Sequence, residues 1–214
     1  MKLSSFHKHR AVGPISLIAI FLAIGIILSC GRPPEIHYYT VEVNSGKKDA
    51  NHTAQLPYAV GIVKFDGGVL YTDDRIIYRE SPYEVKFWHY RRWIAPPNIL
   101  VTEAVREYIK AHEIFRDVVG YPSANPPHML LTGKVKAFEE IDKPEGWFAK
   151  VALQLTLTDL KNKQVVWEDY VEATTEIPQK QPASVVESIN RALNQCLEEI
   201  VQSLRRNLKN EPAK

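Results

Sequence analysis

The chain lacks the sequence signatures of nucleotide and zinc sites. The turn Asp66-Gly67-Gly68 is not followed by the Lys and Ser or Thr of a phosphate-binding loop. The histidines are scattered, and no pair has the spacing of zinc ligands on a helix. They include His37, His52, His89, His112 and His128. No Ser, His and acidic residues form a recognisable catalytic set. We therefore predict a protein that is not an enzyme and that holds no cofactor and no metal.

Acidic residues are absent from the first 29 positions, where three basic residues precede the apolar run Ile15–Leu28. This order is typical of a secretion signal. The sequence Ile27-Leu28-Ser29-Cys30 resembles the lipobox of bacterial lipoproteins. In a lipobox, a small residue such as Ser29 admits a peptidase, and the thiol of Cys30 accepts a diacylglycerol. We therefore predict a signal peptide at residues 1–29 and a lipid-bearing Cys30.

An uncleaved anchor helix is the alternative for this segment. Residues 11–29 carry no charge, and roughly 20 apolar residues suffice to cross a bilayer. Gly13-Pro14 and Gly25 disfavour a continuous helix, and a plain anchor does not require a Cys where the apolar run stops. In either case the domain is held at a membrane and faces away from the cytosol.

The mature domain carries almost no net charge. The full chain has 27 basic and 25 acidic residues, and loss of three basic residues with the signal leaves 24 basic residues against 25 acidic ones. The sequence pI of about 8.4 therefore does not indicate nucleic acid as a partner. With Cys30 acylated, Cys196 is the only thiol, so no intramolecular disulfide can form and the domain must depend on its core.

Short runs of β-branched and aromatic residues predict strands along most of the chain. From Trp147 onwards, Val151, Leu153, Leu155 and Leu157 share one face, as in a half-buried strand. The predicted strands are His37–Val43, Tyr58–Phe65, Glu84–Tyr90, Phe115–Val119 and a three-stranded meander over Met129–Thr175. Val69–Arg79 is predicted to be an extended edge or bent segment, and Asn44–Gln55 a polar loop.

Two helices interrupt the strands. Asn98 is a predicted N-cap for a helix over Ile99–His112, and Ser184 with Glu187 predicts a capping box for a last helix that ends near Leu208. The order of strands, helix, strands and helix predicts a single α+β domain. We expect a mainly antiparallel or mixed sheet, with hairpins between most neighbouring strands and two helices packed on one face.

Two groups of reactive residue types have ordinary structural interpretations. Glu139, Glu140, Asp142 and Glu145 lie before Trp147 and could bind a cation, but a solvated hairpin tip is the favoured interpretation. Cys196 lies in the apolar stripe of the last helix and is predicted to be a packing residue.

The run from Tyr78 to Trp93 is unusually rich in aromatic residues and arginine. These residue types dominate protein interfaces. A strand with one buried aromatic face and arginine on its wet face is the alternative explanation. The candidate interaction residues are Tyr78, Arg79, Tyr90, Arg91, Arg92 and Trp93.

An ordered series of motifs resembles the ABC-type transport auxiliary lipoproteins, which include the paraquat-inducible protein C type. The motifs are Tyr38-Tyr39-Thr40, Val60-Gly61-Ile62, Tyr71 with Asp74-Arg75, Ile76-Ile77-Tyr78-Arg79, Tyr90-Arg91-Arg92-Trp93 with Pro96 and Pro97, Gly133-Lys134-Val135 with Phe138-Glu139, and the run Ala152–Leu160. The polar insertion around Lys47-Lys48 and the long C-terminal helix depart from the family pattern. The resemblance covers nearly the whole mature chain.

The resemblance implies a non-enzymatic auxiliary of an ABC-type lipid transport system in the cell envelope. Its partners would be a substrate-binding protein with mammalian-cell-entry (MCE) domains, a permease and an ATPase, and it would assemble as a homo-oligomeric ring. Because Gly31 rather than Asp follows Cys30, lipoprotein sorting favours the outer membrane, facing the periplasm, with the inner membrane as the alternative.

Two other functions remain open at this point. One is a structural envelope lipoprotein that binds another periplasmic protein or the cell wall, and the other is an enzyme acting on lipid or peptidoglycan. The predicted organisation is a signal peptide at 1–29, a lipidated Cys and spacer at 30–35, a periplasmic domain at 36–209 and a polar tail at 210–214.

Overall fold

The structure is a computed structural model that describes residues 34–44 and 55–208. The predicted signal peptide, Cys30, most of the predicted polar loop and the predicted tail lie outside the described residues. From Ile36 onwards the chain belongs to one compact unit. The strands are β1 (His37–Tyr39), β2 (Leu56–Val63), β3 (Arg75–Arg79), β4 (Lys86–Trp93), β5 (Phe115–Tyr121), β6 (Met129–Lys143), β7 (Gly146–Asp159) and β8 (Gln164–Glu176), and the helices are α2 (Pro97–Ala111) and α3 (Pro182–Leu208).

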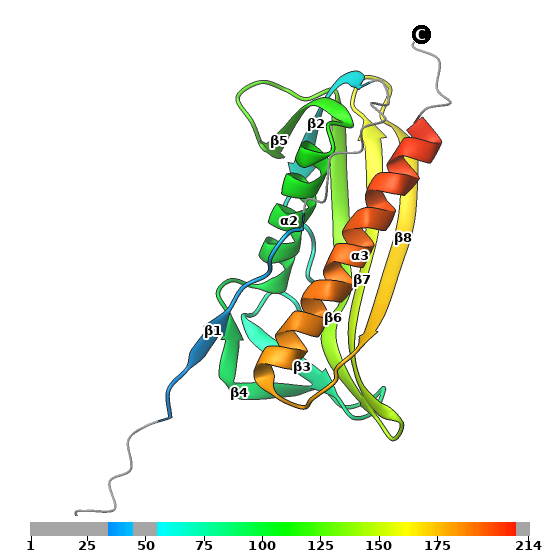
Figure 1. The fold of residues 1–214 in the computed structure, drawn as a ribbon. Coiled ribbons are helices and arrows are strands. Elements are labelled where there is room, and N and C mark those ends of the chain that lie inside the picture. Colours follow the sequence, from blue (N-terminus) through cyan, green and yellow to red (C-terminus); the bar gives the residue numbers. More distant parts are fainter. Residues whose placement is uncertain (1–33, 45–54, 209–214) are drawn as a thin grey trace, which may run out of the picture. The chain divides into compact units, whose positions relative to one another are not determined.

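All the described strands join one mixed sheet, and both helices lie on the same side of it (Figure 1). This confirms the predicted α+β class. The hairpins β3–β4, β6–β7 and β7–β8 are antiparallel, whereas β1–β4, β2–β5, β2–β6 and β3–β6 are parallel pairs. The prediction of hairpins between most neighbouring strands is therefore wrong. Parallel pairs join segments that are distant in the sequence and leave no local turn signal.

Strand β6 organises the sheet, because one of its edges is shared by two strands. Its other edge pairs with β7 from Met129 to Lys143. On the shared edge, β2 pairs with the first residues of β6, at Val60↔Met129 to Ile62↔Leu131. Further along, β3 pairs with the same edge at Ile77↔Glu139 to Arg79↔Ile141. The chain between β2 and β3 must therefore leave the sheet and return to it.

That excursion contains a tight turn. Of the predicted edge or bent segment Val69–Arg79, only β3 is a strand, and the residues before it form turns and bends. The amide of Tyr71 donates to the carbonyl oxygen of Gly67 at 3.0 Å. A Cβ on Gly67 would lie 2.6 Å from the Tyr71 carbonyl oxygen, so only glycine fits there. Gly68 has a φ of +55° with open space around its Cβ position.

The start of α2 is fixed against this excursion. Helix α2 begins at Pro97, with Pro96 at the N-cap position and no side-chain cap. The Asn98 side chain instead donates to the carbonyl oxygen of Phe65 at 3.0 Å. The backbone amide of Asn98 donates to the carbonyl oxygen of Tyr71 at 3.1 Å. The prediction of Asn98 as N-cap is wrong, because a proline at the first helical position starts the helix earlier and the buried Asn98 amide binds a tertiary partner.

Helix α3 presents the predicted apolar stripe to β6, β7 and β8. It begins at Pro182, two residues before Ser184, and the amide of Val185 donates to the carbonyl oxygen of Gln181. Ser184 is thus inside the first turn, and the predicted capping box with Glu187 is wrong. The buried residues of the helix include Val185, Ile189, Leu193, Cys196, Leu197, Ile200, Val201, Leu204 and Leu208.

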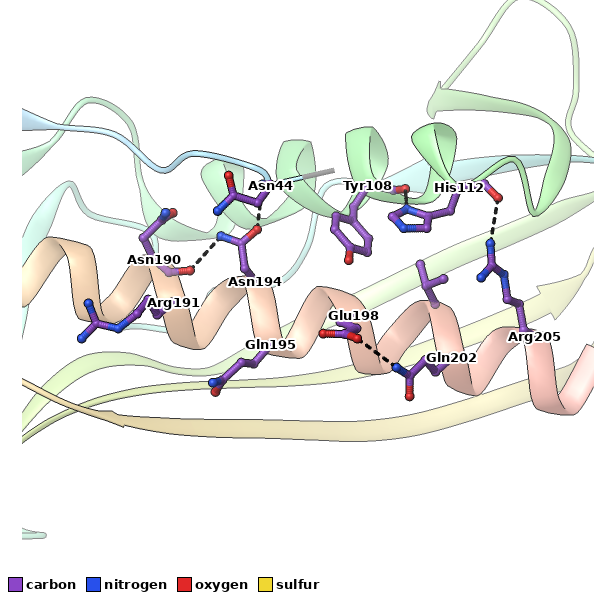
Figure 2. Close-up of a pocket in the computed structure, with 11 residues that line it drawn as sticks. Asn44, Tyr108, His112, Asn190, Arg191, Asn194, Gln195, Glu198, Gln202 and Arg205 are labelled. Carbon is purple, nitrogen blue, oxygen red and sulfur yellow. Dashed lines mark hydrogen bonds between the residues drawn. The ribbon is translucent and has the colours of Figure 1, made fainter. Parts of the chain in front are cut away.

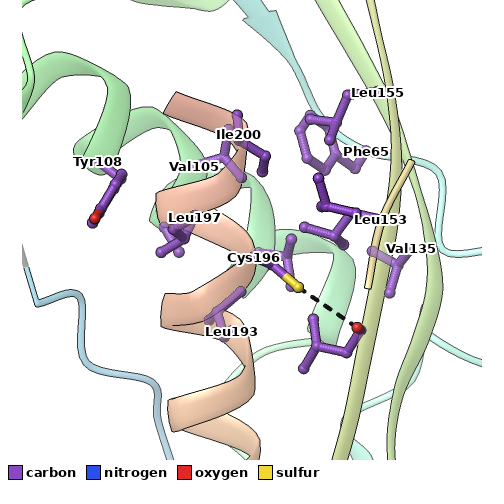
Figure 3. Packing of buried hydrophobic residues seen from close by; sticks show 14 of the residues in the cluster. Phe65, Val105, Tyr108, Val135, Leu153, Leu155, Leu193, Cys196, Leu197 and Ile200 are labelled. Carbon is purple, nitrogen blue, oxygen red and sulfur yellow. Dashed lines mark hydrogen bonds between the residues drawn. The ribbon is translucent and has the colours of Figure 1, made fainter. Parts of the chain in front are cut away.

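The core lies between the two helices and the sheet (Figure 3). Leu153 and Leu155 of β7 face α3, as the alternation predicts, and both are fully buried. Gly133 leaves room for the ring of Phe65, which would lie 3.0 Å from a Cβ at that position. The Sγ of Cys196 lies 3.6 Å from the Val151 carbonyl oxygen. Cys196 is 1% exposed, which confirms its prediction as a packing residue.

Among the described residues, no helix is both long and apolar enough to cross a membrane.

The turn predicts unequal effects of two neighbouring glycine substitutions. Gly67→Ala places a methyl group against the backbone of Tyr71 and is expected to lower the free energy of unfolding by about 1–3 kcal/mol. Gly68→Asn is the matched control, since asparagine tolerates a positive φ and the position is open, so it should change stability by about 0.5 kcal/mol or less. Urea denaturation followed by tryptophan fluorescence measures both. Equal effects would contradict the close approach at Gly67.

Candidate interaction site

A buried ionic cluster lies where β3 meets the second half of β6. Tyr71 donates its hydroxyl to Oε2 of Glu139 at 2.7 Å, and Arg79 donates Nε to Oε1 of the same carboxylate at 2.8 Å. Glu139 is 6% exposed. Burial and the neighbouring Glu139 charge raise the pKa of Tyr71 well above its usual value, so its hydroxyl stays protonated and remains a donor. The excursion, β3 and β6 are therefore joined by one satisfied carboxylate.

A second buried carboxyl group, Glu140, lies next to the first in sequence but on the other face of β6. The indole Nε1 of Trp88 on β4 donates to Oε2 of Glu140 at 3.1 Å. Oε1 of Glu140 and Oδ1 of Asp142 are both buried without a hydrogen-bond partner among the residues that the structure describes. Asp142 uses its other oxygen in an ion pair with Lys180.

A proton held between Glu140 Oε1 and Asp142 Oδ1 would give both oxygens a hydrogen bond. Two ionised carboxylates cannot donate to each other, whereas a protonated Glu140 could donate to Asp142 and satisfy both oxygens. Burial, and then the charge of Asp142, raise the pKa of Glu140 to about 7. Glu140 is thus poised to be neutral below neutral pH and charged above it.

A partly exposed surface lies at the ends of the β3–β4 and β6–β7 hairpins, near this pair, and we call it the hairpin-end surface: Tyr78, Tyr83, Lys86, Trp147 and Lys180. Tyr83, in the β3–β4 connection, is 95% exposed and Trp147 is 37% exposed. The Tyr78 ring meets Trp88 edge-on with centroids 6.3 Å apart. Lys86 pairs with Glu80 at 2.5 Å and lies 6.0 Å from the Tyr78 ring, while Lys180 lies 5.4 Å from the Trp147 ring. The surface thus combines aromatic rings with lysines on a hydrogen-bonded base.

The structure places the six candidate interaction residues in different environments. Tyr78 belongs to the hairpin-end surface, and Arg79 lies on the opposite face of β3 in the ion pair with Glu139. Trp93 is fully buried, with its ring centroid 5.1 Å from that of Phe138.

The other three residues lie along β4. Arg92 pairs with Asp74 at 2.8 Å. Tyr90 is 49% exposed and Arg91 is partly buried. Strand alternation puts Tyr90 and Arg91 on opposite faces. The six residues therefore do not form one patch.

The interpretation of the four acids as a solvated hairpin tip is wrong for two of them. Glu139 and Glu140 are buried, and Asp142 is mostly covered, whereas Glu145 is exposed at the β6–β7 connection. The hydrogen bond of Trp88 to Glu140 was not predicted either. The strand pattern continues through both glutamates and was the sequence signal that they belong to β6 rather than to a loop. Their partners lie on other elements, 52 to 68 residues away in sequence.

A polar groove lies between α2 and α3 (Figure 2). It has a volume of about 450 Å³. At one end, the Asn190 Oδ1 atom accepts from the amide of Glu42 at 2.9 Å, and Asn194 Oδ1 accepts from the amide of Asn44 at 2.8 Å. The Asn194 side chain also donates to the Glu42 carbonyl oxygen at 2.9 Å. The side chains of these two asparagines, one helical turn apart on α3, thus hydrogen-bond to the backbone of residues 42–44, which a neighbouring strand would otherwise do.

The far end of the groove carries no evident reactive pair. His112 follows α2, and its Nδ1 lies 2.8 Å from the Tyr108 carbonyl oxygen. Gln202 donates to Glu198 at 3.1 Å. Burial raises the pKa of the nearby Cys196 thiol to about 12, so this thiol is not activated. Within residues 34–44 and 55–208, no three His, Cys, Asp or Glu side chains are grouped so as to hold a metal ion.

Comparisons with known proteins point to one family. A family model described as ABC-type transport auxiliary lipoprotein component matches residues 48–201. The structure is similar to the crystal structure of a Xanthomonas campestris protein assigned to family DUF330, with a TM-score of 0.69 and 18% identity over 81% of this chain and 96% of that chain. It is also similar to an uncharacterised crystal structure, with a TM-score of 0.63 and 10% identity over 80% of this chain and 99% of that one. No curated protein matches the chain.

Trp93 and Tyr90 should respond differently to truncation. Trp93→Ala removes a fully buried side chain and is expected to lower the free energy of unfolding by about 3–5 kcal/mol. Tyr90→Ala is the control on the same strand and should cost less than about 1 kcal/mol. Urea denaturation of both variants measures the difference. A stable Trp93→Ala variant would show that this side chain is not part of the core.

The Glu140 pair predicts a pH dependence. Because the folded pKa is raised, stability from neutral Glu140 is complete below about pH 4.5 and is lost as pH rises through about 7. The loss should be on the order of 1–3 kcal/mol. Glu140→Gln keeps an acceptor for Trp88 and supplies a permanent donor to Asp142. The variant should therefore be more stable than the natural chain at pH 8.

Chemical denaturation between pH 5 and 8 tests this, with Glu145→Gln as the control because Glu145 is exposed. The natural chain and the control should lose stability across this range, and Glu140→Gln should not. A parallel decline in all three would contradict the shared proton.

Proposed function

The chain belongs to the family of ABC-type transport auxiliary lipoprotein components, and on this premise we propose that it is a non-enzymatic adaptor of a lipid transport system. Its partners in this proposal are an MCE-domain substrate-binding protein with its permease and ATPase. The adaptor holds the periplasmic part of the transporter at a membrane.

The anchor in this proposal is Cys30. The lipobox-like sequence that ends at Cys30 supports acylation there, and two acyl chains give stable attachment where one chain is marginal. Gly31 supports sorting to the outer membrane, with the domain in the periplasm. The inner membrane is the alternative location.

The hairpin-end surface is the proposed docking site, and its exposed aromatic residues are the observation that carries the proposal. Tyr83 is 95% exposed, and aromatic side chains on rigid bases are the residues that most often dominate binding energy. The ion pair of Arg79 with Glu139 and the hydrogen bond of Trp88 to Glu140 fix β3 and β4, the strands on either side of the connection that carries Tyr83. Lys86 and Lys180 are ion-paired with Glu80 and Asp142, so the surface presents aromatic rings beside balanced charges.

The buried carboxylates serve structure rather than catalysis in this proposal. Both oxygens of Glu139 are engaged by Tyr71 and Arg79, and Glu140 is fully buried. Neither group is placed to reach a substrate.

We further propose that copies of the chain assemble into a ring. Within the described residues, β8 pairs with β7 alone and leaves one edge of a 13-residue strand free. An edge of this kind can pair with a second chain.

A crosslinked pull-down of the tagged, lipidated chain from envelope membranes, with mass spectrometry of the bound proteins, tests the proposed function. The MCE protein, permease and ATPase should be recovered together. Tyr83→Ala should lower their recovery about tenfold or more, as expected for loss of a dominant contact. Tyr121→Ala is the control, because Tyr121 is 42% exposed on β5, away from both the hairpin-end surface and the edge of β8.

Recovery of cell-wall or unrelated envelope proteins alone would overturn the transport role and favour a structural lipoprotein. Equal recovery with both variants would overturn the hairpin-end surface as the docking site.

A further inference from the structure

We propose that the edge of the sheet formed by β1 and the end of β4 rests against the surface of the membrane that holds the acyl chains. This inference rests on acylation at Cys30, which belongs to the proposed function, but it requires no transport partner. The occupant of this surface is a lipid headgroup region rather than a protein.

Four large apolar side chains are exposed together on this edge, and we call them the edge patch: Ile36, Tyr38, Tyr90 and Ile94. Their exposed fractions are 41%, 59%, 49% and 67%. They come from two segments more than 50 residues apart in sequence that lie side by side in the fold. Clusters of exposed large apolar residues mark interaction surfaces, whereas single ones do not.

The strand pairing puts these side chains on a common face. Strands β1 and β4 are parallel, with Tyr38 opposite Arg92. Alternation along β4 then places Tyr90 and the position of Ile94 on the face of Arg92, and the amide of Ile94 donates to the Tyr39 carbonyl oxygen at 2.7 Å, which continues the pairing. On the other face of these strands, Trp93 is buried in the core. The edge patch therefore faces away from the core.

The charge at the centre of the edge patch is already neutralised. Arg92 donates from Nη1 to Oδ1 of Asp74 at 2.8 Å. Because Arg92 is already paired, removing this surface of isoleucine and tyrosine from water exposes no unpaired charge to an apolar environment. Edge strands that remain in water usually carry charged side chains that keep other surfaces away.

Chain length identifies the surface that this patch meets. Ile36 follows Cys30 by six residues, and six residues span at most about 22 Å. The start of β1 is therefore held within about 22 Å of the acylated residue. The tether therefore keeps any apolar face beside β1 close to the lipid surface, at a high effective concentration.

The residue types fit the interface between lipid and water. Tyrosine is enriched at headgroup level because its ring is apolar and its hydroxyl is polar. Moving an isoleucine side chain out of water is favourable, and the free energy released is proportional to the apolar area buried. Contact through Tyr38, Tyr90 and Ile94 would fix the orientation of the domain, which a six-residue tether alone would not.

Nitroxide labelling of the full, lipidated chain in vesicles of phosphatidylethanolamine and phosphatidylglycerol tests the proposal. Cys30 is consumed by acylation and Cys196 is 1% exposed, so an introduced cysteine is the accessible thiol. The label is placed by Ile94→Cys in the edge patch. The matched control is Val165→Cys, because Val165 is 57% exposed on β8 and β8 begins at the opposite end of the molecule from β1 (Figure 1).

On vesicles, the label at position 94 should lose most of its collisions with a water-soluble nickel complex and gain collisions with oxygen, and the label at 165 should behave as it does in solution. Similar collision rates at both positions would overturn the proposal. Protection at position 94 that appears without vesicles and grows with protein concentration would show instead that the edge joins two copies. Because the vesicles contain no other protein, these outcomes are independent of the transport role.

Discussion

The fold depends on one long strand whose edge is divided between two shorter ones. Strand β6 pairs with β7 along its whole length, but its opposite edge is taken first by β2 and then by β3. Both short strands run parallel to β6, so the chain between them must leave the sheet. That excursion carries Tyr71 to Glu139 and fixes the start of α2. It also sets the position of β4, because β4 pairs with β3.

The polar cluster at the second half of β6 follows from the same arrangement. Strand β3 brings Arg79 to Glu139, and β4 brings Trp88 to Glu140. Two neighbouring carboxyl groups are thus buried on opposite faces of one strand, and each is held by a different element. Ionic and hydrogen-bonded groups of this kind are costly to leave unpaired, which favours a single register of β3 and β4. The hairpin-end surface is therefore presented on a fixed base.

Local patterns in the sequence predict the parts of the fold that local contacts decide. The alternation of Val151, Leu153, Leu155 and Leu157 predicts the inner face of β7, and the stripe along α3 predicts the side that it buries. The α+β class follows from these patterns. The parallel pairs do not, because β2 and β6 are far apart in sequence and nothing near either strand indicates the other.

The other wrong predictions have two different causes. Asn98 and Ser184 have the residue types of helix caps, but a proline at the first helical position begins each helix earlier. Glu139 and Glu140 have the composition of a solvated tip, and only tertiary partners make their burial tolerable. The aromatic and arginine-rich run was recognisable as unusual. Its division into buried Trp93, paired Arg92 and exposed Tyr90 depends on strand faces that the sequence did not define.

The central claim is that the β3–β4 hairpin end is the contact between this lipoprotein and its transport partners. Hydrogen–deuterium exchange of the lipidated chain, alone and in the complex, tests it most directly. Exchange at residues 80–88 should slow on binding, with little change along β8. Protection confined to other elements, with exchange at residues 80–88 unchanged, would contradict this claim.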